Sequence, residues 1–411
     1  MNKLFYGLPP FDQFVAKGDL EETEDIFQSR KEVMKKISNQ INNAQHSLLI
    51  PVVGETGNGK THFLWGIKNT FNIDAFTTFI ALPRSKDKFY YYVYSDFLEE
   101  FAASHLREFT QNFGDRFGAN ERLFGFFRTH NTVKVFMNAY QSLKEEFRYK
   151  KALEQCVSVT ISHLMNPEKF QVAERWLLGE LMEFDDLFVL NVNEDLSGKN
   201  LAETMLKLLI NNYNPGVLLL FDDFEEASQE YSSLGTSYFD DEFDDFDEDS
   251  ENDEEDETLI EKIMNLLVHT NNFKIVISMG FEEAENILSS IKEKLADKSL
   301  MADPISLTKI TLNDVYQLYL ERMKKFCYTN KANHPVIELS LNDYTSRDKS
   351  DIPDTLFYPL TKEIIKHIYE VSDGNARRIL KNFKRIFDAL IFEEIEVQNL
   401  NSEYKNHIST F

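Results

Sequence analysis

Three largely apolar runs stand out along the chain, and small or polar residues follow each of them. They are LLIPVV at residues 48–53, VLLLF at 217–221 and KIVISM at 274–279. Runs of this length are typical of strands that are buried on both faces of a parallel sheet. Elsewhere apolar residues recur at helical spacing, for example at Phe63, Ile67 and Phe71. The pattern therefore predicts an α/β fold in which helices flank a parallel sheet.

The residues after the first run read GETGNGKT, from Gly54 to Thr61. This is the P-loop spacing, in which glycines let backbone N–H groups curl around phosphate oxygens where a Cβ would clash. Lys60 would reach the β- and γ-phosphates, Thr61 would bind Mg²⁺, and the positive end of the following helix would face the anion. The motif predicts a site for ATP and Mg²⁺; the alternative is an ordinary glycine-rich turn. The residues expected to contact the nucleotide are Gly54, Glu55, Thr56, Gly57, Asn58, Gly59, Lys60, Thr61 and His62.

A P-loop site also needs a carboxylate at the end of a neighbouring strand, where it helps to hold Mg²⁺. Asp222 directly follows the run at 217–221, at the carboxyl end where ligands of α/β sheets bind. It is the predicted metal-side carboxylate. Asp223 is predicted to orient the attacking water, with Glu225 and Glu226 as substitutes. The alternative is that these acids cap the turn after the strand.

Two further polar positions are candidates for sensing the γ-phosphate. Ser278 in the third run would contact the γ-phosphate or the water, or would act as a local cap. The stretch SDGNARRIL at 372–380 predicts the start of a helix. Arg377 and Arg378 in its first turn oppose the helix dipole, so an anion such as the γ-phosphate is expected nearby. The alternative is an ordinary surface helix.

These motifs in this order resemble the AAA+ ATPases, and within them the origin-recognition-complex-like initiator ATPases. The resemblance covers Ile26 to about Ile391 and rests on GETGNGKT, LLLFDD, the IVIS strand and GNARRIL. It implies an AAA+-type P-loop fold with a C-terminal helical lid. In that lid Arg377 would read the γ-phosphate, while Arg30 would lie near the adenine. Residues 305–326 resemble the family's last core strand passing into the lid.

The chain departs from this family by its length between motifs. Lys60 and Asp222 are 162 residues apart, and the apolar patches between them predict a helical insertion rather than a loop. Within the insertion, RWLLGE at 175–180 is similar to a branch of P-loop proteins associated with BREX-type phage defence. The expected division is an N-terminal segment with the first half of the core at 1–90, the insertion at 91–213, the second half of the core at 214–310 with a disordered acidic loop at 239–258, and the lid at 311–411.

A second departure concerns the arginine finger that family members present to a neighbour's γ-phosphate. The stretch from Met279 to Glu321 contains no arginine. Arg84, Arg322 or a partner would have to supply one, so slow intrinsic turnover is expected. The stretch at 393–411 is also too short for the winged-helix domain of initiators, which argues against origin recognition.

Charge and composition limit the choice of partners. The formal net charge is −25, and the segment from Asp240 to Glu257 contains 14 acidic residues and no basic one. Solvated disorder is the expectation for it, and a docking peptide or nucleic-acid mimic is the alternative. Without a lysine or arginine cluster, strong direct nucleic-acid binding is not supported.

Cys156 and Cys327 are expected to be buried, reduced thiols. The absence of a signal peptide or a membrane-length apolar run predicts a cytoplasmic protein.

Together the motifs predict an Mg-ATP-binding AAA+-type ATPase that acts as a nucleotide-dependent switch or assembly factor in a protein complex. Such a complex would serve replication initiation or antiviral defence, with protein partners or further copies of the chain. Two alternatives remain open. One is an ATP-gated scaffold that does not hydrolyse ATP, and the other is a ring-forming DNA loader, against which the net charge argues.

Overall fold

The computed structural model describes residues 10–11, 28–44, 46–71, 76–80, 88–100, 103–120, 122–123, 127–128, 131–213, 216–227, 257–271, 273–295, 297–329, 352–392 and 394–409. The chain forms two compact units. Unit 1 comprises Met1–Gln40, Val52–Thr70 and Pro304–Phe411, and unit 2 comprises Ile41–Pro51 and Phe71–Asp303. Most of the acidic run and Arg84 lie outside the described residues.

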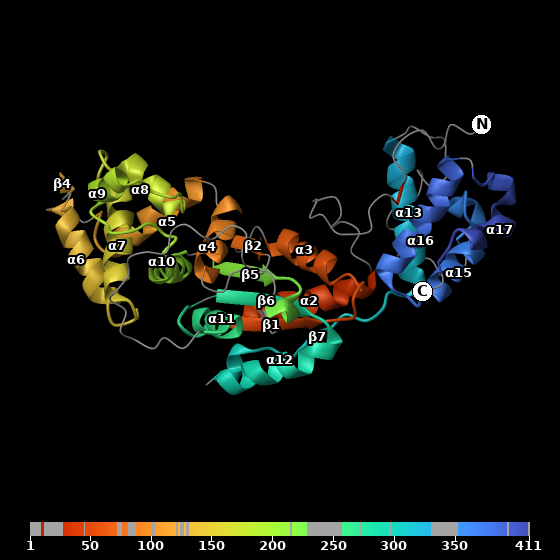
Figure 1. Cartoon of the computed structure of the whole chain (residues 1–411), viewed down its shortest axis with the longest axis horizontal. Coiled ribbons are helices and arrows are strands. Elements are labelled where there is room, and N and C mark those ends of the chain that lie inside the picture. Colours follow the sequence, from red (N-terminus) through yellow and green to blue (C-terminus); the bar gives the residue numbers. More distant parts are fainter. Residues whose placement is uncertain are drawn as a thin grey trace, which may run out of the picture. The chain divides into compact units, whose positions relative to one another are not determined.

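A parallel sheet forms the centre of the α/β fold, as the sequence predicts (Figure 1). Among the described residues its strand order is β2-β5-β6-β1-β7. The strands are β1 (Leu48–Val53), β2 (Phe76–Ile80), β5 (Val217–Phe221), β6 (Phe273–Met279) and β7 (Ile305–Ser306). β5 pairs in parallel with both β2 and β6, and β1 pairs in parallel with β7. Every residue of β1, β5 and β6 is buried, which explains why their sequences are continuous apolar runs.

In unit 2 the chain between β2 and β5 folds mainly into helices. They are α4 (Phe89–Glu100), α5 (Ala103–Arg116), α6 (Thr132–Leu143), α7 (Lys150–Met165), α8 (Phe170–Leu177), α9 (Phe184–Leu190) and α10 (Lys199–Asn212), with a small antiparallel hairpin of β3 (Arg122–Leu123) and β4 (Phe127–Arg128). The 3₁₀ turn η2 (Phe224–Ala227), α11 (Leu259–Val268), α12 (Phe281–Lys294) and η3 (Lys298–Leu300) follow. Trp176 is fully buried among these helices, and its indole N–H donates to the Glu194 carbonyl at 3.1 Å.

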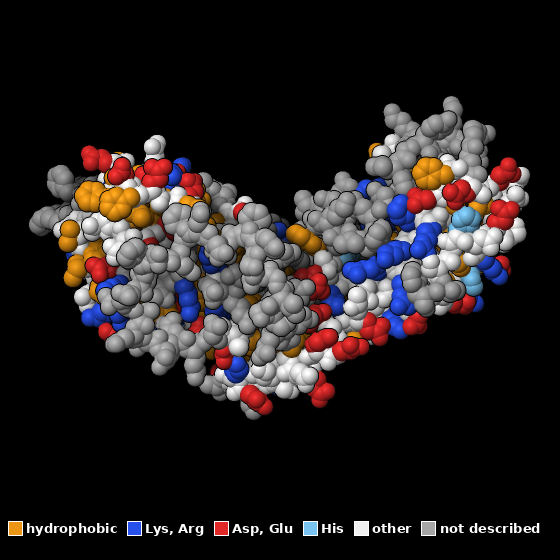
Figure 2. Space-filling model, in the orientation of Figure 1, with side chains coloured by type: hydrophobic (Ala, Val, Ile, Leu, Met, Phe, Trp, Pro, Cys, Tyr) orange, Lys and Arg blue, Asp and Glu red, His pale blue; other side chains and the backbone are white. Residues whose placement is uncertain are grey.

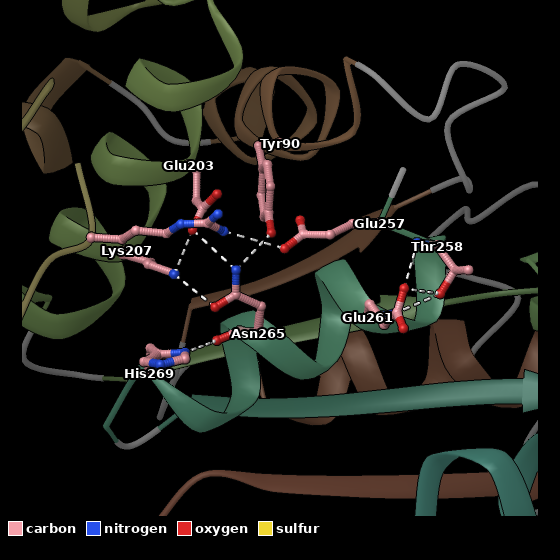
Figure 3. Close-up of polar contacts among 9 residues, drawn as sticks. Tyr90, Glu203, Lys207, Glu257, Thr258, Glu261, Asn265 and His269 are labelled. Carbon is pink, nitrogen blue, oxygen red and sulfur yellow. Dashed lines mark hydrogen bonds and ion pairs between the residues drawn. The ribbon is translucent and has the colours of Figure 1, made fainter. Parts of the chain in front are cut away.

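A buried polar network connects α4, α10 and α11 within unit 2 (Figure 3). The ammonium of Lys207 lies 2.7 Å from Glu203 Oε1 and 3.0 Å from Asn265 Oδ1. The Asn265 amide donates in turn to Glu203 Oε1 at 3.1 Å and to the Tyr90 hydroxyl at 3.2 Å. Burial and the nearby Glu203 carboxylate raise the pKa of Tyr90. The network therefore fixes the helices on either side of it in one arrangement.

In unit 1 the helices are α2 (Gln28–Asn43), α3 (Lys60–Phe71), α13 (Leu312–Thr329), α15 (Lys362–Val371), α16 (Ala376–Ile391) and α17 (Leu400–Glu403), with 3₁₀ turns η6 (Asp354–Phe357), η7 (Val397–Asn399) and η8 (Tyr404–Asn406). The segment from α13 onward is the predicted lid, and an aromatic cluster fills its core. The ring of Phe11 lies 4.8 Å from Phe383, 5.2 Å from Phe387 and 5.7 Å from Tyr319 between centroids. The apolar face of α16 thus packs inward, which leaves its charged residues on the outside.

Both cysteines, Cys156 and Cys327, are buried and form no disulfide. Burial raises the pKa of the Cys327 thiol to about 11. The helices that the structure describes include none with the length and apolar character to cross a membrane.

Candidate functional site

The glycine-rich segment forms a tight turn between β1 and α3. Gly57 and Gly59 have φ values of 86° and 84°, in the left-handed region that favours glycine. The Asn58 N–H donates to the Glu55 carbonyl at 3.1 Å, and α3 begins directly after Gly59. The segment therefore has the strand, glycine turn and helix N-terminus that a phosphate-binding loop requires.

Lys60 lies over this turn. Its side chain is buried, and its ammonium donates to the Gly54 carbonyl at 3.1 Å. A Cβ added at Gly59 would meet no atom within 4 Å, so the turn is open on that side. The Lys60 ammonium and the open side of the turn at Gly59 could together bind a phosphate group. The phosphate would then compete with the Gly54 carbonyl for the ammonium. Thr61 follows in the first turn of α3 and is half-buried.

Arg30 supports the turn from α2. Its guanidinium is buried and donates to the carbonyl of Asn58 at 3.2 Å and to the carbonyl of Thr308. Burial lowers the pKa of Arg30, and the charge of Asp314 partly offsets this effect. The structure thus places Arg30 beside the glycine-rich turn, where it bonds to one carbonyl of the turn and to one carbonyl of the segment after β7. Its predicted contact with adenine stays a prediction.

Asn58 has an unusual environment for a loop residue. Its amide donates to the Leu307 carbonyl at 3.2 Å, while its buried Oδ1 has no hydrogen-bond partner among the described residues. The Leu307 N–H donates to the Val53 carbonyl at 2.7 Å, so Leu307 is bonded both to the end of β1 and to Asn58 of the turn. A buried amide oxygen without a donor is costly, and an incoming ligand or water would satisfy it.

The first turn of α16 contacts the P-loop directly. The Asn375 amide donates to the Thr56 carbonyl at 2.8 Å, and its Oδ1 caps α16 by accepting from the Arg378 N–H at 3.2 Å. The Arg377 N–H donates to the Gly57 carbonyl at 3.2 Å. A Cβ at Gly57 would approach Asn375 Oδ1 to 2.5 Å. The stretch SDGNARRIL predicts only a helix start, and the contact of Asn375 with Thr56, 319 positions away, has no local signal in the sequence.

Charged side chains surround this junction. The Arg377 side chain is exposed. Lys309 forms an ion pair with Asp373, just before α16, and lies 3.8 Å from Glu55 of the P-loop. These pairs are exposed and contribute little stability. The structure therefore brings Arg30, Asn375 and the backbone of Arg377 to the P-loop within unit 1.

The predicted carboxylates Asp222 and Asp223 lie in unit 2, directly after β5, and Ser278 lies in the neighbouring strand β6. Phe221 pairs with Ile277, so Asp222 and Ser278 are the next residues of neighbouring strands. The fully buried Ser278 hydroxyl donates to the Asp222 carboxylate and accepts from the Asp223 N–H at 3.3 Å. Asp223 has a φ of 48°, an uncommon conformation for a residue with a side chain. Ser278 therefore holds Asp222 in one orientation and fixes the turn at Asp223. Its predicted contact with the γ-phosphate stays untested.

Comparison with known proteins adds only a distant likeness. No protein-family model matches the chain, and no curated protein does. Among solved structures, the chain is similar to one of the Aeropyrum pernix ORC2 protein, described as its ADPNP-ADP complexes. The two share 12% sequence identity with a TM-score of 0.39, and the alignment covers 96% of this chain and 71% of that chain. The described residues define an α/β protein whose parallel sheet is flanked by helices, with a P-loop-like turn after β1.

Proposed function

We propose that this chain binds Mg-ATP at the turn between β1 and α3 and acts as a nucleotide-dependent switch in a protein complex. The main support is the contact of the first turn of α16 with the backbone carbonyls of Thr56 and Gly57. In a P-loop the N–H groups face the phosphates. A nucleotide that reorients these peptide groups would also change the carbonyls to which the lid is bonded. Binding would therefore bias the position of the lid, which a partner could recognise.

Each predicted residue has a role in this proposal. Lys60 and the N-terminus of α3 would bind the phosphates, and Thr61 and Asp222 would hold Mg²⁺, with Ser278 keeping Asp222 oriented. Bound Mg²⁺ neutralises charge on the phosphate oxygens. Asp223 would orient the attacking water, and Arg377, which is exposed, would approach the γ-phosphate when the lid closes.

A second candidate is an ATP-gated scaffold with negligible hydrolysis. Two observations favour it. The stretch from Met279 to Glu321 has no arginine that could complete a neighbour's site. The residue after Asp222 is an aspartate, Asp223, at the position where many ATPases carry the glutamate that orients the attacking water. Both candidates share the nucleotide site and differ in turnover. The pathway, whether replication initiation or antiviral defence, belongs to the proposal and depends on the partner.

Steady-state release of phosphate from Mg-ATP, measured over a series of protein concentrations, separates the candidates. Lys60→Ala serves as the blank. Release above this blank supports hydrolysis, and a rate per chain that rises with concentration would mean that a neighbouring copy completes the site. ATP binding with release at the blank level supports the scaffold. A wild-type chain that neither binds ATP nor releases phosphate would refute both.

The same assay tests Arg377. Arg377→Ala is expected to lower phosphate release or the preference for ATP over ADP. Arg385→Ala is the matched control, since Arg385 is also exposed on α16. Equal behaviour of the two variants would remove Arg377 from the mechanism.

A further inference from the structure

A cluster of apolar side chains on and beside α9 faces solvent. Leu181, Phe184 and Phe188 have exposed fractions of 72%, 80% and 77%, and Val189 is also exposed. Phe184 and Phe188 are four residues apart, so they share one face of the helix. Figure 2 shows hydrophobic side chains bordered by acidic ones over the place that α8 and α9 occupy in Figure 1. We call these four residues the α9 patch.

The backbone below the α9 patch is held in place by side chains. Arg175 on α8 bridges the turn, with Nε 2.8 Å from Glu180 Oε2 and Nη1 2.8 Å from Asp186 Oδ2. The Tyr91 hydroxyl donates to the Gly179 carbonyl at 3.1 Å. At the start of the patch, the Met182 N–H donates to Asp195 Oδ2 at 3.1 Å. These bonds hold the backbone on both sides of Phe184 in an ordered turn. The exposure of the two phenyl rings is therefore a feature of an ordered segment.

The chain segment that carries the patch is mainly acidic. Between Trp176 and Gly198 the chain contains six carboxylates and no lysine or arginine. Glu183 and Asp185 flank Phe184 and are exposed. The nearby cation of Arg175 is already bonded to Glu180 and Asp186. A surface that is apolar in the middle and acidic at its border is complementary to a partner with apolar residues between cationic ones.

We propose that the α9 patch docks an amphipathic helix of a partner protein, in which lysine and arginine flank an apolar stripe. Two turns of helix with phenyl rings at i and i+4 offer a ridge against which another helix can pack. A second copy of this chain is a poorer fit, because a twofold contact through the patch would bring the acidic borders together. The interface is small, which suits a reversible contact. This inference does not depend on the nucleotide site.

The test uses the full chain and a synthetic helical peptide of lysine and leucine, about 18 residues long to give five turns. A scrambled peptide of the same composition controls for simple attraction between charges. The double variant Phe184→Ser/Phe188→Ser is compared with Val133→Ser/Met137→Ser, which alters another exposed pair at i and i+4, on α6. Circular dichroism checks that each variant is folded.

We expect the helical peptide to bind the wild-type chain, and to bind Phe184→Ser/Phe188→Ser at least about tenfold more weakly. The α6 control should bind as the wild type does, the scrambled peptide should bind weakly, and Glu183→Gln/Asp185→Asn should weaken binding at low salt. Equal binding to both double variants, equal binding of the scrambled peptide, or no binding to the wild type would overturn the proposal. Sedimentation that shows a wild-type dimer, lost in Phe184→Ser/Phe188→Ser, would overturn it in favour of self-association.

Discussion

Asn375 Nδ2 lies 2.8 Å from the backbone oxygen of Thr56, so the first turn of α16 is bonded to the glycine-rich turn after β1. The same side chain caps α16 through its oxygen, which accepts from the Arg378 N–H. One residue therefore fixes both the start of the helix and a carbonyl of the loop. If a nucleotide binds in this loop, the Asn375 side chain would couple the loop to the start of α16.

Asn375→Ser separates these two roles. Serine is also a good N-cap, but it is too short to reach the Thr56 carbonyl as the amide does. The bond exists without nucleotide, so its loss should lower the free energy of unfolding by about 1 kcal/mol. ATP should also bind more weakly, by roughly fivefold, because the variant no longer holds the loop at Thr56. Calorimetric titration with ATP and urea unfolding measure the two quantities, and an unchanged ATP affinity would contradict the role given to the amide.

Gly57 and Gly59 offer a matched pair for testing the same junction. Both have a left-handed φ, but only a Cβ at Gly57 would collide with Asn375. Gly59→Ala should therefore lower the free energy of unfolding by about 1 kcal/mol through backbone strain alone. Gly57→Ala should cost clearly more. The double variant Gly57→Ala/Asn375→Ser should recover part of the extra loss in stability that Gly57→Ala shows over Gly59→Ala. Equal losses for the two alanine variants in urea unfolding would mean that the contact is absent in solution.

The buried network of Figure 3 predicts a strong effect in unit 2. Lys207→Met leaves the Glu203 carboxylate buried without its cation, which should cost about 3–5 kcal/mol of the free energy of unfolding. Glu203→Gln/Lys207→Met should be less destabilised, because no buried charge remains. Lys384→Met is the control: Lys384 and Asp388 form an ion pair at 2.8 Å on the surface of α16, and its loss should cost less than about 0.5 kcal/mol. Similar losses at both sites would argue that the network is solvated.

The N-terminus of α11 predicts a pH-dependent effect. Glu261 forms a capping box with Thr258, and its ion pair with Lys294 together with the bond from the Thr258 N–H lowers its pKa from 4.5 to about 2. Since the folded pKa is below the ordinary value, the carboxylate stabilises the fold above pH 4.5, and this contribution is lost as the pH falls towards 2.

Glu261→Gln should therefore be less stable than the wild type at pH 7, by less than about 1 kcal/mol because the ion pair is exposed. The difference should shrink steadily in urea unfolding between pH 4.5 and pH 2. Glu285→Gln, at an exposed position of α12, should show no comparable trend. A difference that grows on acidification would have the wrong sign for this explanation.

The central strands of the sheet were predictable because burial on both faces demands continuous apolar sequence. This holds for β1, β5 and β6, which are buried along their whole length. The strand β2, FTTFI, gave no such signal: it contains two threonines, and its pairing partner β5 lies far along the chain. Its aromatic and β-branched residues suit a strand, but its place beside β5 depends on that long-range pairing, which the local sequence does not encode.

In the candidate site, too, the local motif was predictable and the long-range contacts were not. The P-loop was readable because its glycines and lysine are adjacent in sequence, and its turn has the backbone conformation that those glycines permit. The bond from Asn375 to Thr56 joins residues 319 positions apart, and no local pattern indicates it. The bond from Ser278 to Asp222 likewise depends on the register of β5 and β6.

The proposed function depends on the binding of Mg-ATP at the turn that contains Lys60. We would measure this binding by calorimetric titration of the wild-type chain and of Lys60→Ala with Mg-ATP. Urea unfolding in the absence of nucleotide confirms that the variant is folded. We expect saturable binding of one ATP per wild-type chain and a loss of at least about tenfold in affinity in the folded variant, because a charged hydrogen bond contributes roughly 1.5–3 kcal/mol. Equal affinity of the two proteins, or no binding by the wild type, would contradict the proposed function.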